Sequence, residues 1–361
     1  MSLAQRKEVF LQAIELETAE ERRRFVAEAC QGDDDLCNEV NALLQQHDAE
    51  SGPVDQPLVK RDARSDGGSP LEAASSIYSP GTTIGPYRLM EQIGEGGFGL
   101  VFVAEQGRPV RRQVALKIIK PGMETREVIA RFEAERQALA MMDHANIARV
   151  FDAGVTESKQ PYFVMELVRG TPLNEFCDRH ALTTNERLEI FVSICHALHH
   201  AHQKGIIHRD LKPSNVLVSM QDGKPVAKVI DFGVAKAIGQ SLTDKTIYTR
   251  FTSMVGTPAY MSPEQAGMNN VDVDTRSDIY SLGVLLYELL TGGTPFSGER
   301  LSSLDFDELR RVIREEDPPL PSARFSTLDQ VAASTISSQR KVEPTRLVAT
   351  IRGDLDWIVM K

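Results

Sequence analysis

The stretch His208-Arg209-Asp210-Leu211-Lys212-Pro213-Ser214-Asn215, followed by Asp231-Phe232-Gly233, decides the fold of this chain. Phosphoryl transfer needs an acceptor for a hydroxyl proton, a cation beside the transferring group and oxygen ligands for Mg²⁺. Asp210 can accept the proton and Lys212 can neutralise the phosphoryl group, while Asn215 and Asp231 can ligate the ion. Each motif alone has an ordinary alternative, such as a helix cap for an aspartate. Their order and spacing together indicate phosphoryl-transfer chemistry.

A glycine-rich stretch lies upstream, at Gly94-Glu95-Gly96-Gly97-Phe98-Gly99-Leu100-Val101. This glycine spacing alone is a weak signal, because dinucleotide-binding folds and ordinary turns share it. Here the apolar residues that continue from Val101 predict a second strand rather than a helix, so the stretch is expected to form a hairpin. Backbone without Cβ atoms can then cover phosphates. The residues expected at the nucleotide are Gly94, Glu95, Gly96, Gly97, Phe98 and Gly99.

A lysine follows within an apolar strand, Val114-Ala115-Leu116-Lys117. An unpaired ammonium group is costly to bury, so Lys117 needs an anionic partner. Glu135 lies in a stretch with helical periodicity, residues 125–142, and can supply a carboxylate. Nucleotide phosphates would supply the remaining negative charge.

Composition excludes several classes of protein. The chain has 361 residues, 41% of them hydrophobic, and a net charge of −10. That sign disfavours binding to nucleic acid or to anionic lipid. The four cysteines show no Cys-x-x-Cys spacing, which indicates reduced thiols and a cytoplasmic protein. No apolar run approaches the ~20 residues that span a membrane, so no membrane contact is expected within this chain.

The pattern along the chain predicts three regions. Residues 1–50 have apolar residues at helical spacing and contain 12 acidic and 5 basic side chains. They form either an acidic docking helix pair or a solvated helical appendage, and charge runs are more often solvated faces. Residues 51–82 have the composition of a flexible linker. Residues 83–361 begin with short strands and continue with longer helical stretches, including 186–203, 278–291 and 304–315.

The motifs from about Gly85 to Phe296 resemble those of the eukaryotic-type (Hanks-type) protein kinases. Their detailed sequence is similar to that of bacterial members of this family. The resemblance implies an α+β fold with two lobes, a β-rich N-lobe and a helical C-lobe, preceded here by the N-terminal helical appendage. It implies ATP and Mg²⁺ as cofactors, with Asp210, Lys212, Lys117 and Glu135 as catalytic residues and Asn215 and Asp231 as metal ligands. Asp278 resembles the helical aspartate that holds the catalytic-loop backbone.

The same resemblance implies the walls of an adenine pocket. Met165 stands at the family's gatekeeper position. The backbone of Glu166 to Val168 resembles the hinge that binds adenine. The residues that resemble the roof and floor are Ile93, Val101, Ala115 and Leu217.

Lys212 and the stretch Gly256-Thr257-Pro258-Ala259-Tyr260 resemble the serine/threonine branch, so Ser and Thr hydroxyls of proteins, including the chain's own, are the expected acceptors. Arg209 resembles the arginine that meets an activation-segment phosphate. We therefore expect autophosphorylation within 246–253; the alternative is an exposed Thr-rich loop without regulatory meaning.

The chain departs from the family pattern near its end. Family members continue through further C-lobe helices, one preceded by an arginine that pairs with the glutamate at the position of Glu264. The C-lobe is therefore expected to be incomplete, with Glu264 lacking that partner and residues 318–345 disordered. The alternative to a working kinase is an ATP-binding module with weak or no activity that acts by binding partners. A small-molecule phosphotransferase is disfavoured by Lys212 and by the segment 256–264.

Four histidines, His196, His199, His200 and His202, resemble a metal cluster but lie on one predicted helix without a matching carboxylate or cysteine. Packing and capping explain them more simply than zinc.

Overall fold

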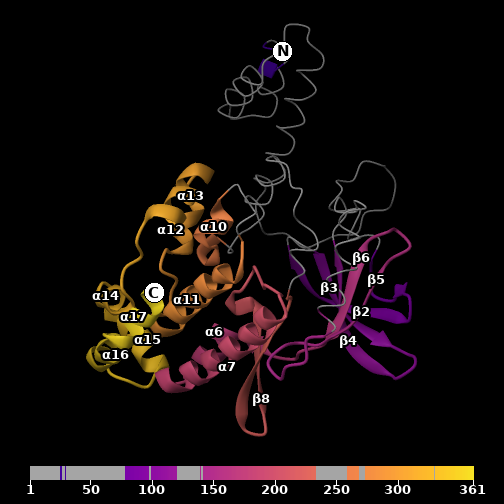
Figure 1. Cartoon of the computed structure of the whole chain (residues 1–361), viewed down its shortest axis with the longest axis horizontal. Helices are drawn as coiled ribbons and strands as arrows, with labels where there is room; N and C mark the ends of the chain where they lie inside the picture. Colours follow the sequence, from indigo (N-terminus) through magenta and orange to yellow (C-terminus); the bar gives the residue numbers. More distant parts are fainter. Residues whose placement is uncertain are drawn as a thin grey trace. The chain divides into compact units, whose positions relative to one another are not determined.

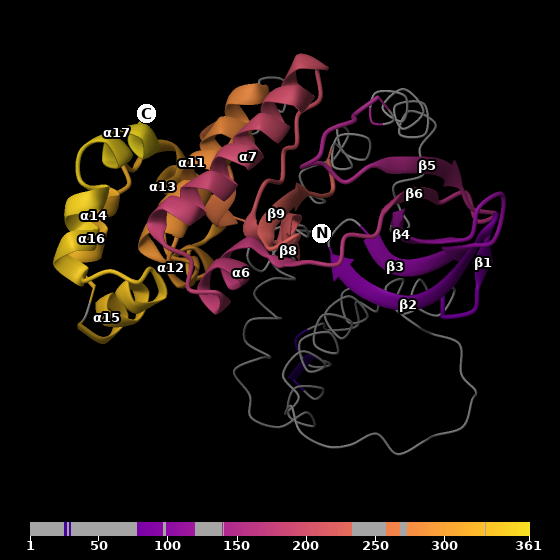
Figure 2. The same ribbon diagram turned by 90° about the horizontal axis from the view of Figure 1, so that it is seen from below.

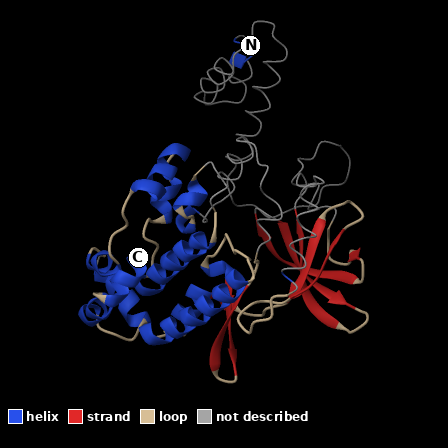
Figure 3. Ribbon diagram, viewed as in Figure 1, coloured by secondary structure: helices blue, strands red, loops and turns tan. Residues whose placement is uncertain are grey.

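The computed structural model describes residues 25, 26, 29, 78–96, 99–119, 139, 141–232, 258–267, 273–328 and 330–361. The chain divides into two units, residues 1–67 and 68–361. In the first unit Phe25, Val26 and Ala29 are helical. The second unit carries a sheet followed by helices (Figures 1 and 3). The two-lobed α+β architecture expected from the sequence is confirmed.

The N-lobe is an antiparallel sheet with strand order β1-β2-β3-β4-β6-β5. Its strands are β1 (Thr83–Ile84), β2 (Tyr87–Gly96), β3 (Gly99–Gln106), β4 (Arg112–Ile119), β5 (Val150–Val155) and β6 (Pro161–Glu166). β2 and β3 are curved neighbours in Figure 2, and their register pairs Gly96 with Gly99. The glycine-rich hairpin predicted from the sequence is therefore present. β4 and β6 are buried along most of their length, whereas β2 and β3 bury only some of their side chains. One buried cluster of the sheet includes Leu89, Phe102, Leu116 and Val164.

The C-lobe is mainly helical. Its helices are α6 (Leu173–Arg179), α7 (Thr184–Gln203), α10 (Pro263–Ala266), α11 (Thr275–Thr291), α12 (Gly298–Ser302), α13 (Phe306–Glu315), α14 (Pro321–Ser326), α15 (Gln330–Gln339), α16 (Pro344–Ile351) and α17 (Asp354–Met360). Two short 3-10 helices are η1 (Pro213–Asn215) and η2 (Pro258–Tyr260). A small sheet has the order β7-β8-β9, from β7 (Thr171–Pro172), β8 (Val216–Gln221) and β9 (Lys224–Val229).

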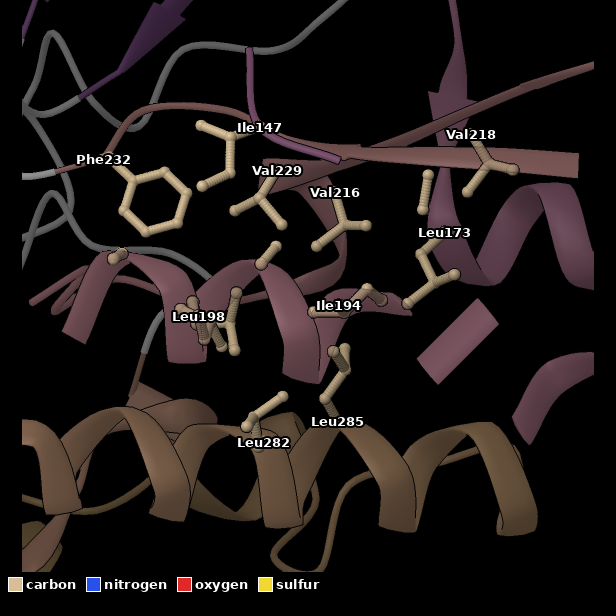
Figure 4. Close-up of a cluster of buried hydrophobic side chains, with 14 of the residues drawn as sticks. Ile147, Leu173, Ile194, Leu198, Val216, Val218, Val229, Phe232, Leu282 and Leu285 are labelled. Atoms are coloured by element: carbon tan, nitrogen blue, oxygen red, sulfur yellow. The ribbon is translucent and has the colours of Figure 1, made fainter. Parts of the chain in front are cut away.

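The C-lobe core lies between α7, α11 and the β8–β9 hairpin. Leu198 and Ile194 on α7 face Leu282 and Leu285 on α11, and Val229 of β9 lies on the other side of α7 (Figure 4). α7 begins with a capping box in which Thr183 and Glu186 satisfy each other's backbone N–H groups. Both helices match the periodic stretches in the sequence.

The expectation that residues 318–345 are disordered is wrong for the residues described there. They form α14, α15 and the start of α16. Phe325 and Leu347 pack against Leu286 and Leu290 of α11. A Ser- and Thr-rich composition concealed these helices, because the few apolar residues that bury them are far apart in the sequence.

Candidate active site

The catalytic-loop stretch, residues 208–215, connects the end of α7 to β8 and is held by one buried carboxylate. Asp278, on the first turn of α11, is fully buried. Its Oδ2 atom accepts the backbone N–H of His208 at 2.8 Å, and Oδ1 accepts that of Arg209 at 2.8 Å. His202 Nε2 also donates to Oδ2, at 2.7 Å. The expectation that Asp278 holds this backbone is confirmed.

These donors set the charge state of Asp278. Burial alone raises the pKa of this carboxyl group, but the hydrogen bonds from His202, His208 and Arg209 outweigh burial and hold the pKa below its ordinary value. The carboxylate is therefore ionised at neutral pH. Arg209 needs such support because it has φ of 68°, a left-handed conformation that is unfavourable for a side chain of its size.

His208 joins the loop to the strand that precedes Asp231. Its Nε2–H donates to the carbonyl of Ile230 at 2.9 Å, while Nδ1 accepts the N–H of Asp210 at 3.3 Å. A carbonyl only accepts and an amide N–H only donates, so one neutral tautomer satisfies both bonds. The fully buried ring also lies edge-on to Phe232, with centroids 4.7 Å apart.

Asp210, Lys212 and Asn215 meet at one carboxylate oxygen. Lys212 Nζ lies 3.0 Å from Asp210 Oδ2. Asn215 Nδ2 donates to the backbone carbonyl of Asp210 at 2.7 Å and to Oδ2 at 3.1 Å. The structure thus brings together three of the residues that the sequence motif selected.

The donor set fits a hard divalent cation. Because Nδ2 of Asn215 is held by Asp210, its amide oxygen is the atom left to act as a ligand. The N–H of Ile230 donates to the carbonyl of Asn215 at 2.9 Å. Asp231 follows Ile230 in the chain, so this bond brings Asp231 close to Asn215. An amide oxygen and carboxylate oxygens are ligands that Mg²⁺ prefers.

Lys117 reaches this cluster from the N-lobe. Its side chain is 8% exposed and its Nζ atom lies 2.9 Å from Asp231 Oδ2. β4 carries Lys117 and the segment after β9 carries Asp231, so the pair joins the two lobes. Asp231 itself has φ of 64°. Glu135, the partner expected from the sequence, lies outside the described residues, so that pairing stays a prediction.

The residues expected around adenine come from both lobes. In the sheet Ala115 lies opposite Met165, and both are buried. Val101 lies opposite Gly94 on one side and Lys117 on the other. Leu217, on β8, pairs with Pro172, while Ile93 is about half exposed. Gly97 and Phe98 lie outside the described residues, and Val168 follows β6.

Glu166 at the end of β6 is fixed through its side chain, a contact that the sequence reasoning missed. Its Oε2 atom accepts Lys228 Nζ at 3.0 Å and the N–H of Arg149 at 3.3 Å. Lys228 lies on β9, so this contact holds the residues that follow β6 against the C-lobe. A single lysine before Asp231-Phe232-Gly233 gives no sequence signal for this pairing.

Residues 258–264 are the described part of the segment 256–264, which in the sequence disfavours a small-molecule phosphotransferase. Ser281 Oγ donates to the carbonyl of Tyr260 at 2.9 Å, and Ser277 Oγ donates to Glu264 Oε1 at 2.6 Å. Glu264, expected to lack an arginine partner, thus has a serine hydroxyl instead. The hydroxyls expected to be phosphorylated, in 246–253, lie outside the described residues.

A half-buried acidic group that contacts this segment was also missed. The Tyr260 hydroxyl donates to the Glu288 carboxylate on α11. Burial raises the pKa of Glu288, with hydrogen bonds from Tyr260 and Asn174 opposing the rise. Burial and the Glu288 charge also raise the pKa of Tyr260. No local pattern predicts this contact, because the two residues lie 28 positions apart along the chain.

The histidines of α7 have separate contacts. His202 binds Asp278, His199 hydrogen-bonds Gln203 at 2.9 Å, and His200 packs against His144 with ring centroids 5.3 Å apart. Among the described residues no group of three or more His, Cys, Asp or Glu side chains is arranged to hold a metal ion. Burial raises the pKa of Cys177 and of Cys195 to about 11, which keeps both thiols protonated and unreactive.

Across the described ranges, no helix is both long and apolar enough to cross a membrane.

Comparison with known proteins gives a consistent result. Residues 87–348 match the model of the protein kinase domain. The probable serine/threonine-protein kinase PknB of Lactococcus lactis is 39% identical over 258 residues, covering 70% of this chain and 39% of the relative. The serine/threonine-protein kinase PknB of Mycobacterium tuberculosis is 39% identical over 74% of this chain and 42% of the relative. Pkn1 of Myxococcus xanthus is 33% identical over 81% and 41%, respectively.

The chain spans about two fifths of the length of these curated relatives. Among solved structures, the kinase domain of Mycobacterium tuberculosis PknI matches with a TM-score of 0.50 and 24% identity. The match covers 76% of this chain and 97% of that domain. At this level of identity the likeness shows the fold.

Proposed function

The chain belongs to the protein kinase family, and from that premise we propose that it transfers the γ-phosphoryl group of Mg-ATP to Ser and Thr hydroxyls of proteins. The observation that carries the proposal is the cluster around Asp210. The carboxylate that would accept the hydroxyl proton is held by Lys212 and Asn215, and Lys117 and Asp231 are paired 2.9 Å apart. The names of the curated relatives support Ser/Thr specificity.

Each side chain has a distinct role in this proposal. Lys212 and Asn215 both contact Asp210 Oδ2, so Oδ1 is the oxygen that receives the substrate proton. Lys212 also neutralises charge on the transferring phosphoryl group. Asn215 and Asp231 would hold Mg²⁺, which when bound neutralises charge on the nucleotide phosphates. Lys117, freed by rearrangement from Asp231, orients the phosphates, with Glu135 as its other partner.

The nucleotide would lie between the glycine-rich hairpin and β8. Gly94, Glu95, Gly96, Gly97, Phe98 and Gly99 would cover the phosphates. Ala115, Val101 and Ile93 would lie above the adenine, Leu217 below it, and the backbone of Glu166 to Val168 would hydrogen-bond its edge. The fixed Glu166 side chain supports this placement of the hinge backbone.

The acceptors are Ser and Thr hydroxyls of protein substrates and, in the chain itself, hydroxyls within residues 246–253. Arg209, directly before Asp210, is the candidate contact for such a phosphate, since an Arg–phosphate pair can order a loop. Mass spectrometry after incubation with Mg-ATP tests this step. Full activity without phosphate in 246–253 would contradict it.

The test of the main proposal is transfer of labelled γ-phosphate to the chain and to a generic Ser/Thr protein, with Asp210→Asn as the comparison. We expect labelled Ser and Thr with the unchanged chain and at least a ~100-fold loss with the variant. Nucleotide binding by both proteins without transfer by either would favour the alternative, a nucleotide-binding interaction module.

A further inference from the structure

Gln265, on α10, makes an unusual pair of contacts for a residue outside the catalytic motifs. Its Oε1 atom accepts the N–H of Ser262 at 3.0 Å, which completes the capping box of α10. Its Nε2 atom donates to the carbonyl of Arg209 at 2.7 Å. The side chain thus connects the segment 258–266 to the residue directly before Asp210.

The Arg209 carbonyl belongs to the peptide group that carries Asp210. The oxygen of this group is held by Gln265 and its N–H is held by His208 Nδ1. The preceding N–H, that of Arg209, is held by Asp278. If this peptide plane turned, the Cα–Cβ bond of Asp210 would turn with it, and the carboxylate would point in another direction. Arg209 has φ of 68°, so the plane relies on these contacts to keep its orientation.

Only a neutral amide suits this position. Its oxygen accepts from Ser262 while its nitrogen donates to Arg209, whereas a carboxylate can only accept. Glutamate would retain the cap, since it completes capping boxes as well as glutamine does. It would, however, place two acceptor oxygens against each other at the Arg209 carbonyl. The two roles of Gln265 can therefore be separated by substitution.

We propose that Gln265 is a positioning residue for Asp210 that couples the segment 258–266 to the catalytic loop. The inference rests on the proposed kinase function. When the segment docks, α10 presents Gln265 to the Arg209 carbonyl and fixes the Asp210 peptide. When it does not dock, that carbonyl loses its donor. Coupling of this kind makes proton acceptance by Asp210 depend on the placement of the segment.

The test compares Gln265→Glu with Gln265→Met in the full chain, measuring kcat and KM for phosphate transfer together with nucleotide affinity and the midpoint of urea unfolding. Met is close in size to Gln but makes neither contact. We expect kcat to fall at least about tenfold in Gln265→Glu and less in Gln265→Met, with nucleotide affinity and KM nearly unchanged. Unfolding midpoints should follow another order: both variants lose the bond to the Arg209 carbonyl, but only Gln265→Met also loses the cap, so its midpoint should be the lowest.

A matched control is Glu186→Gln in the capping box of α7, remote from the catalytic loop, which should leave kcat unchanged. If kcat follows the unfolding midpoint across the variants, or if Gln265→Glu retains full kcat, Gln265 is a helix cap alone and the proposal is overturned. Absence of Asp210-dependent transfer in the unchanged chain would instead overturn the proposed function, and this inference with it.

Discussion

At the scale of single residues, the site depends on buried charges whose partners come from other elements. Asp278 has no exposed surface, yet it stays ionised because two backbone N–H groups and His202 donate to it. Lys117 is nearly as buried and is balanced by Asp231. In both cases burying the charge lowers the stability of the fold only slightly while its partners are in place. If one partner is removed, the remaining buried charge destabilises the fold by its full desolvation penalty.

Replacing Asp278 with Asn should lower the free energy of unfolding by about 3 kcal/mol, because an amide group cannot accept from all three donors. Since the folded pKa of Asp278 lies below its unfolded value, its contribution is present above about pH 4 and is lost as pH falls through the folded pKa. The difference between the two proteins, measured by urea unfolding, should therefore be constant near neutrality and shrink below pH 4. Asp274→Asn, at the exposed cap of the same helix, should change little. An equal loss in both variants would contradict this.

Replacing Lys117 with Met keeps the apolar stem and removes the ammonium group. Phosphate transfer should fall by a factor on the order of 10², the usual effect of deleting one group that stabilises transition-state charge. Labelled transfer measured at saturating Mg-ATP checks the value. Transfer at the unchanged rate would show that Lys117 serves only to neutralise Asp231.

At the scale of elements, α7 and α11 form the platform on which the catalytic loop rests. The loop leaves from the end of α7, and the first turn of α11 supplies its anchor. Leucines of α11 pack against α7 and the β8–β9 hairpin (Figure 4). The position of Asp278 therefore follows from apolar packing at the next turns of the same helix.

Leu285→Ala in this interface should lower the free energy of unfolding by about 2 to 5 kcal/mol, because a fully buried leucine leaves a cavity. Ile279→Ala lies on the same helix, but that side chain is 57% exposed, and the cost should be below about 1 kcal/mol. Urea unfolding of the two variants measures both. Similar costs would mean that the α7–α11 packing is not as close as described.

At the scale of the whole molecule, the helices after residue 320 pack on the C-lobe rather than extending from it. Asp356 on α17 accepts both the N–H and the hydroxyl of Ser322 on α14, at 2.9 and 2.6 Å. Arg340 is buried and donates to the carbonyl of Leu289 on α11 at 2.7 Å. Burial lowers the pKa of Arg340 to about 10, which still leaves it charged at neutral pH.

Hydrogen exchange followed by mass spectrometry should show protected amides in α15 and α16. Asp356→Ala should lower protection in α14 and α17, since the Ser322 N–H and hydroxyl lose their acceptor in a buried place. Asp354→Ala, an exposed position on the same helix, is the matched control. Exchange of 330–351 at the rate of an unstructured chain would contradict the packing described here.

The sequence alone was sufficient for the family resemblance, the glycine-rich hairpin, the long helices and the catalytic motif, because these follow from local spacing, periodicity and the chemistry of adjacent side chains. The family resemblance also singled out Asp278 as the residue that holds the catalytic-loop backbone. Tertiary structure decided what distant residues do together: Lys228 with Glu166, Tyr260 with Glu288, Gln265 with the Arg209 carbonyl, and the burial of α14 to α17. These contacts join segments tens of residues apart, and no local pattern encodes them. They form only when apolar packing brings the segments together, and a buried polar group then takes whichever partner the fold supplies.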